Sequence, residues 1–539
     1  MKLFGSIFGS PEAGALDQLP VEGVYGMTVF VRRFLRALLQ YGDFDELHFF
    51  IGGLQTELPE GALLRSDPRI RCHRLLEFAS AVEQQPFHVL HNLWSPDIGP
   101  WTDMRNRLTG RNIPITGLTH TISYQSFLPR VLGTMLLGMR PYDSIICTAS
   151  TAVEVMRNWV EHLQQGFGGE TGIDLRYRGR LDQIPLAVDP EIFRPGDQTE
   201  LRRRLGLPPD DVLALYVGRF SHYDKMDLFP LVLAFETMVR RVTTPRATLI
   251  LAGGDSFHEY ARRVEAFAGQ LGIGDRVTIR KNVTDADMPA LYAACDLFVS
   301  PSDNLQETFG QSLLEAMASG LPVVCSDWDG YKDLVVHEST GLRVPTYWAE
   351  ADGLLADHSG LSDWLFDHFY LSQMVSVDVP ELSRAIELLV CDSGLRKKWG
   401  EAGRRRVHEL FSWQVVVRQY LDLWNELSAI AAATPPAKPQ LTSWYRPDFV
   451  RTFRNYPTAV LGPNARVIAS SRQVLPPYPE IAPYLDPRVL SRIRDLAASG
   501  MEVGDLEAKV VGECEITPGS FRFHLLWSLK YDQLALNRR

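Results

Sequence analysis

Two glutamates separated by seven residues frame a segment whose residue types could bind an anion and hydroxyl groups. Glu307 precedes a predicted helix, and Glu315 follows about two helical turns later. Gly310 lies at the predicted first turn, where unpaired backbone N–H groups and the positive end of the helix dipole favour a phosphate. For an isolated pair, the alternative is that Glu307 caps the helix and Glu315 is a solvated surface residue.

A second polar segment follows a predicted strand at residues 212–217. Arg219 and Lys225 lie in the loop after this strand, beside a glycine. Open α/β sheets bind ligands at the carboxyl ends of their strands, so two cations in this loop could neutralise a diphosphate. The alternative is solvated surface charge.

Two further candidates lie in the first third of the chain. His120 ends a predicted strand at 115–119, which is again a ligand-binding position, although a single histidine is more often structural. Gly26 lies in a loop before the first long helix, where a glycine allows close approach of a phosphate, and an ordinary turn is the alternative.

Residues 299–335 carry the most specific pattern. Glu307, the Phe309–Gly310 pair, Glu315 and the following Ala-Met-Ala-Ser-Gly-Leu-Pro-Val-Val run resemble the donor-site signature of glycosyltransferase family 4, also called glycosyl transferases group 1. The resemblance implies the GT-B fold and retaining transfer of a sugar from a nucleotide-diphosphate sugar. It covers about residues 1–430, densely over 212–345 and thinly before 190.

The resemblance also implies a role for each candidate. Glu307 would hold the donor sugar hydroxyls, Glu315 would accept from the ribose, and His120 would contact the sugar from the opposite domain. The residues that it assigns to catalysis are His120, Arg219, Lys225 and Glu307, and those that it assigns to donor binding are Gly26, Phe309, Gly310 and Glu315. The chain departs from the family pattern in lacking an adjacent glycine pair at Gly26 and in having Met226 where a glycine usually follows the lysine.

Strand-like and helix-like runs alternate through most of the chain, which predicts parallel sheets covered by helices on both faces. We therefore expect an α/β protein of the GT-B class with two Rossmann-like domains facing a cleft, followed by a small helical extension. Residues 346–380 are longer than a minimal connection and carry Trp348, Trp364 and Phe366, as a helical insertion would.

The predicted boundaries follow from composition and from the resemblance. An acceptor-side domain spans 1–190, a donor-side domain spans 191–411, and a helix at 412–430 crosses back onto the first domain. A Pro-rich linker and extended strap spans 431–486, and a helical module spans 487–539, with helices at 489–498 and 523–536. A homo-oligomer formed through this extension is one predicted partner.

Composition excludes several classes of protein. The 539 residues carry a net charge of −10, so nucleic-acid binding is not favoured, and the six cysteines have no zinc-site spacing. No window is apolar enough for a transmembrane helix, and the N-terminus does not resemble a signal peptide. We expect a cytoplasmic protein that either stays in solution or binds at the membrane surface through cations such as Arg32, Arg33 and Arg36.

Three Asp-x-Asp triplets are of a type that can bind a divalent metal ion. They begin at Asp43, Asp285 and Asp327, and none has companion ligands in the sequence. No metal and no cofactor is predicted.

The sequence therefore predicts a metal-independent, retaining, hexosyltransferase-type enzyme of glycan biosynthesis. Its acceptor is unidentified and could be a sugar, a lipid-linked glycan or a protein. A nucleotide-sugar epimerase or a phosphorylase on the same fold remains an alternative, as does a non-catalytic sugar-nucleotide-binding protein.

Overall fold

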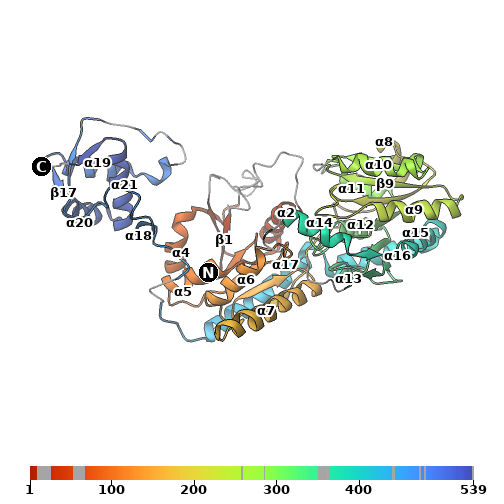
Figure 1. Cartoon of the computed structure of the whole chain (residues 1–539), viewed down its shortest axis with the longest axis horizontal. Coiled ribbons are helices and arrows are strands. Elements are labelled where there is room, and N and C mark those ends of the chain that lie inside the picture. The colour runs from red at the N-terminus through yellow and green to blue at the C-terminus, as the bar shows by residue number, and fades with distance from the viewer. Residues whose placement is uncertain are drawn as a thin grey trace. The chain divides into compact units, whose positions relative to one another are not determined.

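The structure is a computed structural model in which two compact units, Met1–Ser443 and Trp444–Arg539, are described separately (Figure 1). It describes residues 1–8, 26–52, 67–255, 259–284, 286–349, 364–439, 444–472 and 481–536, with isolated positions at 358, 361, 475, 476 and 478. Within these residues, no helix combines the length and apolarity that crossing a membrane requires.

The first unit begins with a seven-stranded parallel sheet in the order β3-β2-β1-β4-β5-β6-β7. Its strands are β1 (Leu3–Phe8), β2 (Glu46–Ile51), β3 (Ile70–Arg74), β4 (Phe87–Asn92), β5 (Ile115–Leu118), β6 (Ser144–Cys147) and β7 (Arg180–Gln183). Its helices are α2 (Gly26–Tyr41), α4 (Phe78–Gln84), α5 (Gly99–Leu108), α6 (Phe127–Leu136) and α7 (Ser150–Thr171). The central strands are buried on both faces, as parallel strands covered by helices must be.

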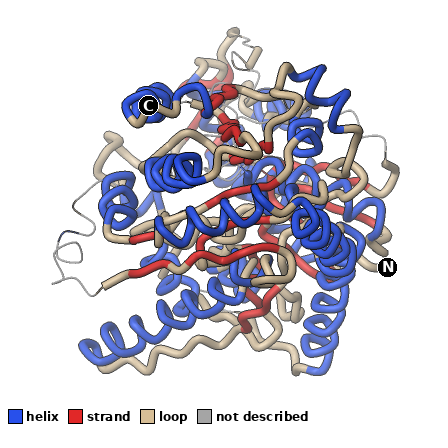
Figure 2. The backbone as a smooth tube through the Cα atoms, turned by 90° about the vertical axis from the view of Figure 1, so that its right-hand side faces the viewer, coloured by secondary structure: helices blue, strands red, loops and turns tan. Residues whose placement is uncertain are grey.

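A six-stranded parallel sheet follows in the order β10-β9-β8-β11-β12-β13. Its strands are β8 (Val212–Val217), β9 (Ala247–Gly253), β10 (Val277–Lys281), β11 (Leu297–Ser300), β12 (Val323–Ser326) and β13 (Gly341–Val344). Its helices are α8 (Gln198–Leu205), α9 (Phe229–Arg241), α10 (Tyr260–Gln270), α11 (Met288–Ala294), α12 (Gln311–Ala318), α13 (Tyr331–Leu334), α15 (Val379–Cys391) and α16 (Ser393–Leu410). Figure 2 shows strands enclosed by helices. The predicted fold class is thus confirmed, with two parallel-sheet α/β domains.

The last long helix of this unit, α17 (Trp413–Ala433), packs against the first sheet. Tyr420 meets Phe34 of α2 edge-on at 5.0 Å, and Trp424 lies 5.5 Å from Phe4 of β1. The Trp424 indole N–H also donates to the Thr116 hydroxyl at 3.2 Å. These contacts attach the end of the second domain to the first, so the two sheets share one packed unit.

The second unit is a three-stranded antiparallel sheet with helices packed on it. Its elements are α18 (Phe449–Thr452), β16 (Arg466–Ala469), α19 (Pro487–Leu496), β17 (Met501–Glu502), α20 (Val503–Cys514), α21 (Pro518–Lys530) and β18 (Leu534–Leu536). β16 is the central strand, although it lies in the range predicted to be an extended strap. The helix predicted at 523–536 is wrong at its end, because α21 stops at Lys530, Asp532 takes a positive φ of 55°, and the chain returns as β18.

Candidate functional site

Lys225 and Glu307 form an ion pair at the carboxyl ends of the neighbouring strands β8 and β11. The Lys225 ammonium donates to Glu307 Oε2 at 2.5 Å, and the Tyr331 hydroxyl donates to the same oxygen at 3.3 Å. Burial alone would raise the pKa of Glu307, but the Lys225 charge and these hydrogen bonds hold it below its usual value. The structure thus brings together Lys225, which is predicted to bind the diphosphate, and Glu307, which is predicted to bind the sugar.

Gly310 places the N-terminus of α12 directly beside this pair. It is the N-cap residue with φ of 109°, so the helix begins at Gln311, two residues later than predicted. A Cβ atom at Gly310 would lie 2.6 Å from the Tyr331 ring, so both backbone conformation and space require glycine. Phe309 is buried, and its N–H donates to Glu307 Oε1 at 3.4 Å.

Arg219 lies in the same loop as Lys225 and is also paired with a carboxylate. Its guanidinium donates to Asp224 Oδ2 at 2.9 Å, and the Asp224 carboxylate is only 4% exposed. This loop is held close to β9, because a Cβ on Gly253 would lie 1.8 Å from the Gly218 carbonyl oxygen. This close backbone approach leaves no room for a side chain at position 253, so it requires a glycine there.

Glu315 makes contacts that the sequence did not predict. Its Oε1 accepts from Arg33 of α2 at 3.1 Å, and its Oε2 accepts from the Tyr292 hydroxyl at 3.2 Å. The Arg33 side chain is 26% exposed and that of Glu315 is 12% exposed, so this pair between the two domains is partly shielded from water. The predicted contact of Glu315 with a ribose stays a prediction.

His120 faces this region from the first domain. Its Nε2 hydrogen-bonds to the Leu93 carbonyl at 2.8 Å, and its own carbonyl accepts from the Thr308 hydroxyl at 2.6 Å. Burial lowers the pKa of His120 to about 4, so its imidazole is neutral at pH 7. The backbone of His120 therefore contacts residues 304–310, called here the Glu307 segment. The predicted contact of the His120 side chain with a sugar stays a prediction.

Gly26 is the first residue of α2, and the predicted glycine loop before it lies outside the described residues. Its proposed role toward a phosphate is therefore untested.

Described aspartates of the Asp-x-Asp triplets form hydrogen bonds or ion pairs with other side chains. Asp43 accepts from the Lys2 ammonium at 2.6 Å, and Asp327 pairs with Arg343 at 3.2 Å. Asp329 accepts from the Thr151 hydroxyl at 2.6 Å, while Asp285 lies outside the described residues. Among the residues that the structure describes, no three His, Cys, Asp or Glu side chains are grouped closely enough to hold a metal ion.

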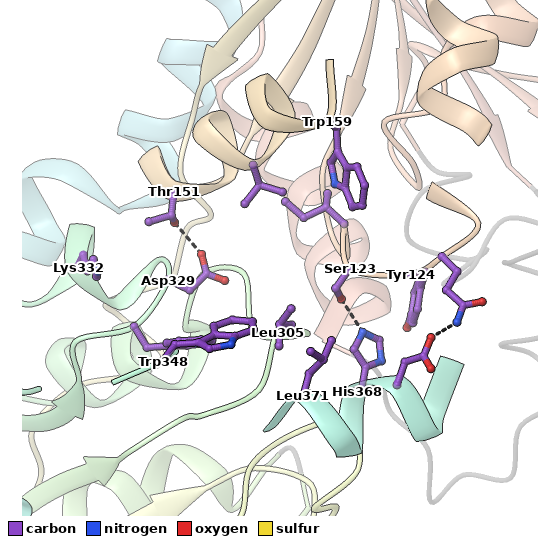
Figure 3. A pocket seen from close by; sticks show the side chains of 15 residues that line it. Ser123, Tyr124, Thr151, Trp159, Leu305, Asp329, Lys332, Trp348, His368 and Leu371 are labelled. Carbon is purple, nitrogen blue, oxygen red and sulfur yellow. Dashed lines mark hydrogen bonds between the residues drawn. The ribbon is translucent and has the colours of Figure 1, made fainter. Parts of the chain in front are cut away.

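A cavity of about 550 Å³ beside the Glu307 segment is a feature that the sequence did not predict (Figure 3). Loop residues 122–125 and α7 line it from the first domain, and Leu305, Trp328 and Lys332 line it from the second. The helix α14 (Trp364–Gln373), inside the predicted insertion, closes one side. The tryptophans of the insertion were the one signal in the sequence, and they do not reveal which residues they meet.

Part of the second domain matches a known protein family. Residues 197–357 match the family described as "Glycosyl transferases group 1". A curated protein from Stackebrandtia nassauensis, named D-inositol 3-phosphate glycosyltransferase, is 36% identical over 198 residues, which cover 35% of this chain and 44% of that protein. The chain thus spans less than half the length of that curated relative.

Solved structures resemble most of the chain. Sucrose-phosphate synthase from Thermosynechococcus elongatus aligns with a TM-score of 0.54 at 21% identity, over 80% of this chain and 100% of that one. HepE from Anabaena, in complex with UDP, aligns with a TM-score of 0.53 at 16% identity, over 79% and 100%. At these identities the likeness shows the fold alone.

Proposed function

We propose that this chain, whose residues 197–357 form a glycosyl transferases group 1 domain on a GT-B fold, moves a sugar from a nucleotide-diphosphate sugar to an acceptor hydroxyl. The predicted group 1 resemblance is confirmed, and membership of family 4 remains a prediction. The observation that carries the proposal is the Lys225–Glu307 ion pair at the N-terminus of α12, inside the matched residues.

The pair can serve a diphosphate and a sugar together. An ammonium has three N–H donors, so Lys225 can keep Glu307 and still donate to a phosphate oxygen. The N-terminal amides of α12 and the Arg219 guanidinium supply further donors to an anion placed there. Glu307 would then accept from the donor sugar hydroxyls, and Glu315 from the ribose.

The proposed reaction retains the configuration at the anomeric carbon. The bond from that carbon to the β-phosphate oxygen breaks, and a bond to the acceptor oxygen forms on the same face. The acceptor proton moves to the leaving phosphate oxygen, so no protein base is needed. Arg219, Lys225 and the α12 amides would stabilise the charge that develops on the diphosphate.

We also propose that the reaction needs no metal ion. Two cations and a helix N-terminus supply the positive charge that a divalent ion supplies elsewhere. Transfer in the presence of excess EDTA should therefore equal transfer without it. Loss of activity that manganese or magnesium restores would contradict this part of the proposal.

The test is a screen of UDP-sugars and other nucleotide sugars for hydrolysis and transfer. D-inositol 3-phosphate belongs among the acceptors, because the curated relative is named for it. Nuclear magnetic resonance of the product would report the anomeric configuration, and an inverted product would contradict retention. Epimerised donor without transfer would favour an epimerase, phosphate-dependent cleavage a phosphorylase, and binding without turnover a non-catalytic protein.

A further inference from the structure

The cavity beside the Glu307 segment is built mainly from aromatic and aliphatic side chains. Figure 3 shows Trp159, Trp348 and Leu371 arranged around it, on elements from both domains and from α14. Trp328 stacks on Trp348 with ring centroids 5.9 Å apart, and the Trp328 indole N–H donates to the Asn304 carbonyl at 3.1 Å. This hydrogen bond fixes one indole plane at the edge of the cavity. The cavity has a volume of about 550 Å³, which lies in the range of small-molecule binding sites.

Specific contacts with the first domain hold α14 over the cavity. His368 Nε2 hydrogen-bonds to the Ser123 hydroxyl at 2.8 Å, and the Gln125 amide donates to Asp367. Tyr124 meets the Trp364 ring edge-on at 5.0 Å. Because α14 belongs to the second domain, the cavity is complete only when the two domains are together.

The charge of the lining disfavours a phosphorylated ligand. Among the described residues that line the cavity, Lys332 is the only Lys or Arg, and Asp329 and Asp367 are carboxylates. A phosphate there would meet more negative than positive charge. A bare sugar is disfavoured too, because each hydroxyl buried without a hydrogen-bond partner is unfavourable.

Asp329 provides a polar anchor for a ligand hydroxyl. Thr151 donates to its Oδ1 at 2.6 Å. Burial raises the pKa of Asp329 to about 7 in spite of this hydrogen bond, with the Glu307 charge adding to the rise. The ionised carboxylate is therefore poorly stabilised, and a hydroxyl donor from a ligand would stabilise it.

The cavity lies next to the proposed donor site. Leu305 lines it two residues before Glu307, and the neighbouring Gln306 amide hydrogen-bonds to the Tyr124 hydroxyl at 3.1 Å. The cations follow β8 and Glu307 follows β11, whereas Asp329 follows β12, the next strand in the sheet. The two sites are thus adjacent along one sheet edge, as a donor site and an acceptor site must be.

We propose that this cavity binds the acceptor, and that the acceptor is a neutral aryl compound whose hydroxyl donates to Asp329. The inference rests on the proposed transfer function and adds the chemical class of the second substrate. The planar indole faces favour an aromatic ring over a hydrocarbon chain. A nucleobase would also stack on indoles, so binding of the donor nucleotide here is the main rival.

Binding of umbelliferone, a hydroxylated coumarin, tests the proposal on the full-length protein. We expect umbelliferone to quench tryptophan fluorescence and to bind more tightly than coumarin, which lacks the hydroxyl. Farnesol and D-inositol 3-phosphate should bind more weakly. Competition by UDP for the umbelliferone site would overturn the proposal in favour of a nucleobase site, and tighter binding of farnesol or of the phosphate would overturn the aryl assignment.

Two variants test separately the stacking of the ligand ring and the hydrogen bond of the ligand hydroxyl. Trp348 is 47% exposed, so Trp348→Ala should fold and should weaken binding of both coumarins about three- to tenfold, the loss expected for one aromatic stack. Asp329 has a positive φ of 42°, which glycine adopts without strain, so Asp329→Gly deletes the carboxylate from a compatible backbone. It should abolish the preference for umbelliferone over coumarin. A preference that survives in D329G would overturn the role of Asp329.

Controls distinguish failure of this inference from failure of the proposed function. Trp444→Ala removes an indole that is not among the residues lining the cavity and should leave umbelliferone binding unchanged. UDP should still raise the melting temperature of the Trp348 and Asp329 variants, since its proposed ligands are intact. Donor hydrolysis without umbelliferone binding or transfer would overturn only the acceptor assignment, whereas absence of donor binding and hydrolysis would overturn the proposed function.

Discussion

The site between the two domains has a first-domain wall, which includes His120 and Arg33, and a second-domain wall, which includes Lys225, Arg219 and Glu307. The two walls differ in the charged groups that they present. On the second-domain wall, Lys225 is paired with the Glu307 carboxylate and Arg219 with that of Asp224. On the first-domain wall, burial keeps His120 neutral, and the groups that meet the opposite wall include its backbone carbonyl. The cations proposed to bind the diphosphate thus lie on one domain, while the other contributes the Arg33 guanidinium to the ion pair with Glu315 and, at His120, neutral hydrogen-bonding groups.

This difference implies an order of events for the proposed reaction. A diphosphate can bind to the second domain before the walls come together, because its proposed ligands lie on that domain. The Arg33–Glu315 pair then connects the walls through an ion pair between α2 and α12. The aromatic cavity is shared by both domains, so we expect the acceptor to bind best to the closed form.

Acid should destabilise the first domain through two buried histidines, His91 of β4 and His120, and this is the largest effect that we expect. Burial lowers the pKa of the fully buried His91 to about 3 and that of His120 to about 4, from an ordinary 6.5. As pH falls below 6.5, the unfolded chain binds protons that these folded residues do not, so stability falls. His91 alone would account for a loss of about 4 kcal/mol once pH reaches its folded pKa.

Urea unfolding measured at pH 7.5, 6 and 5 checks this loss, with the pH values chosen to bracket the ordinary histidine pKa of about 6.5. The pKa of Glu307 is below its usual 4.5, so the stability from the Lys225 pair is lost only as pH falls through that lower value. His91→Gln should reduce the slope between pH 6.5 and 5, because the titrating group is absent. Asp329, whose pKa is raised to about 7, takes up a proton in the folded state over the same interval and opposes the loss, so the difference in slope between the two proteins is the test. An equal slope in the wild type and in His91→Gln would refute the neutral state of His91.

Removing Lys225 should break the charged wall. Lys225→Ala should lose about 2 kcal/mol or more of transition-state stabilisation, or about 30-fold in kcat/KM, because a desolvated phosphate contact disappears. Lys398→Ala, an exposed lysine on α16, is the matched control and should transfer sugar at the normal rate. Near-normal transfer by the Lys225 variant would remove the diphosphate assignment.

A double variant separates catalysis from stability. Lys225→Ala alone leaves the Glu307 carboxylate, only 9% exposed, without its cation and should also destabilise the fold. Lys225→Met with Glu307→Gln removes both charges and should recover part of that stability. Transfer should not recover with it, because both proposed donor ligands are changed.

Removing Arg33 should break the ion pair that connects the two walls, with a smaller effect on donor binding than the loss of Lys225. Arg33→Ala loses a partly exposed ion pair, so we expect about 1 kcal/mol, seen as roughly a fivefold rise in the donor KM. The neighbouring Arg32 is exposed on the same helix, and Arg32→Ala is the matched control. An unchanged or lower KM in the Arg33 variant would show that Glu315 does not need this pair to reach the donor.

The same contrast explains what could be predicted from the sequence. The second-domain wall comes from two short segments, 217–227 and 304–315, so residue types and spacing reveal it directly. Strands β5 and β8 were predicted to within one residue, because each is a short, mainly apolar run. The edge strand β3 was missed, because Ile70–Arg74 is polar and partly exposed.

The first-domain wall and the cavity could not be predicted in this way. Backbone carbonyls such as those of Leu93 and His120 leave no trace in residue types. Arg33 and Glu315 are separated by 282 residues, and only the docking of α2 on the second domain brings them together. The cavity combines loop residues 122–125 with α14 from an insertion, and no local pattern relates these segments.

Deleting the second unit should have the smallest effect on either wall. The residues placed at the site and around the cavity lie before residue 372, in the unit Met1–Ser443. The unit Trp444–Arg539 has its own buried core, which includes Val467, Ile493 and Phe521, so its removal should not open the core of the other. A chain ending at Ser443 should therefore bind and hydrolyse the donor within about twofold of the full chain, a change below about 0.5 kcal/mol.

We expect its oligomeric state or its use of acceptor to change instead, and light scattering with transfer assays measures both. If donor hydrolysis disappears while circular dichroism shows an intact fold, the second unit contributes to the site. If hydrolysis, transfer and oligomeric state all stay the same, the predicted oligomer through this extension is wrong, and the two walls alone account for the activity.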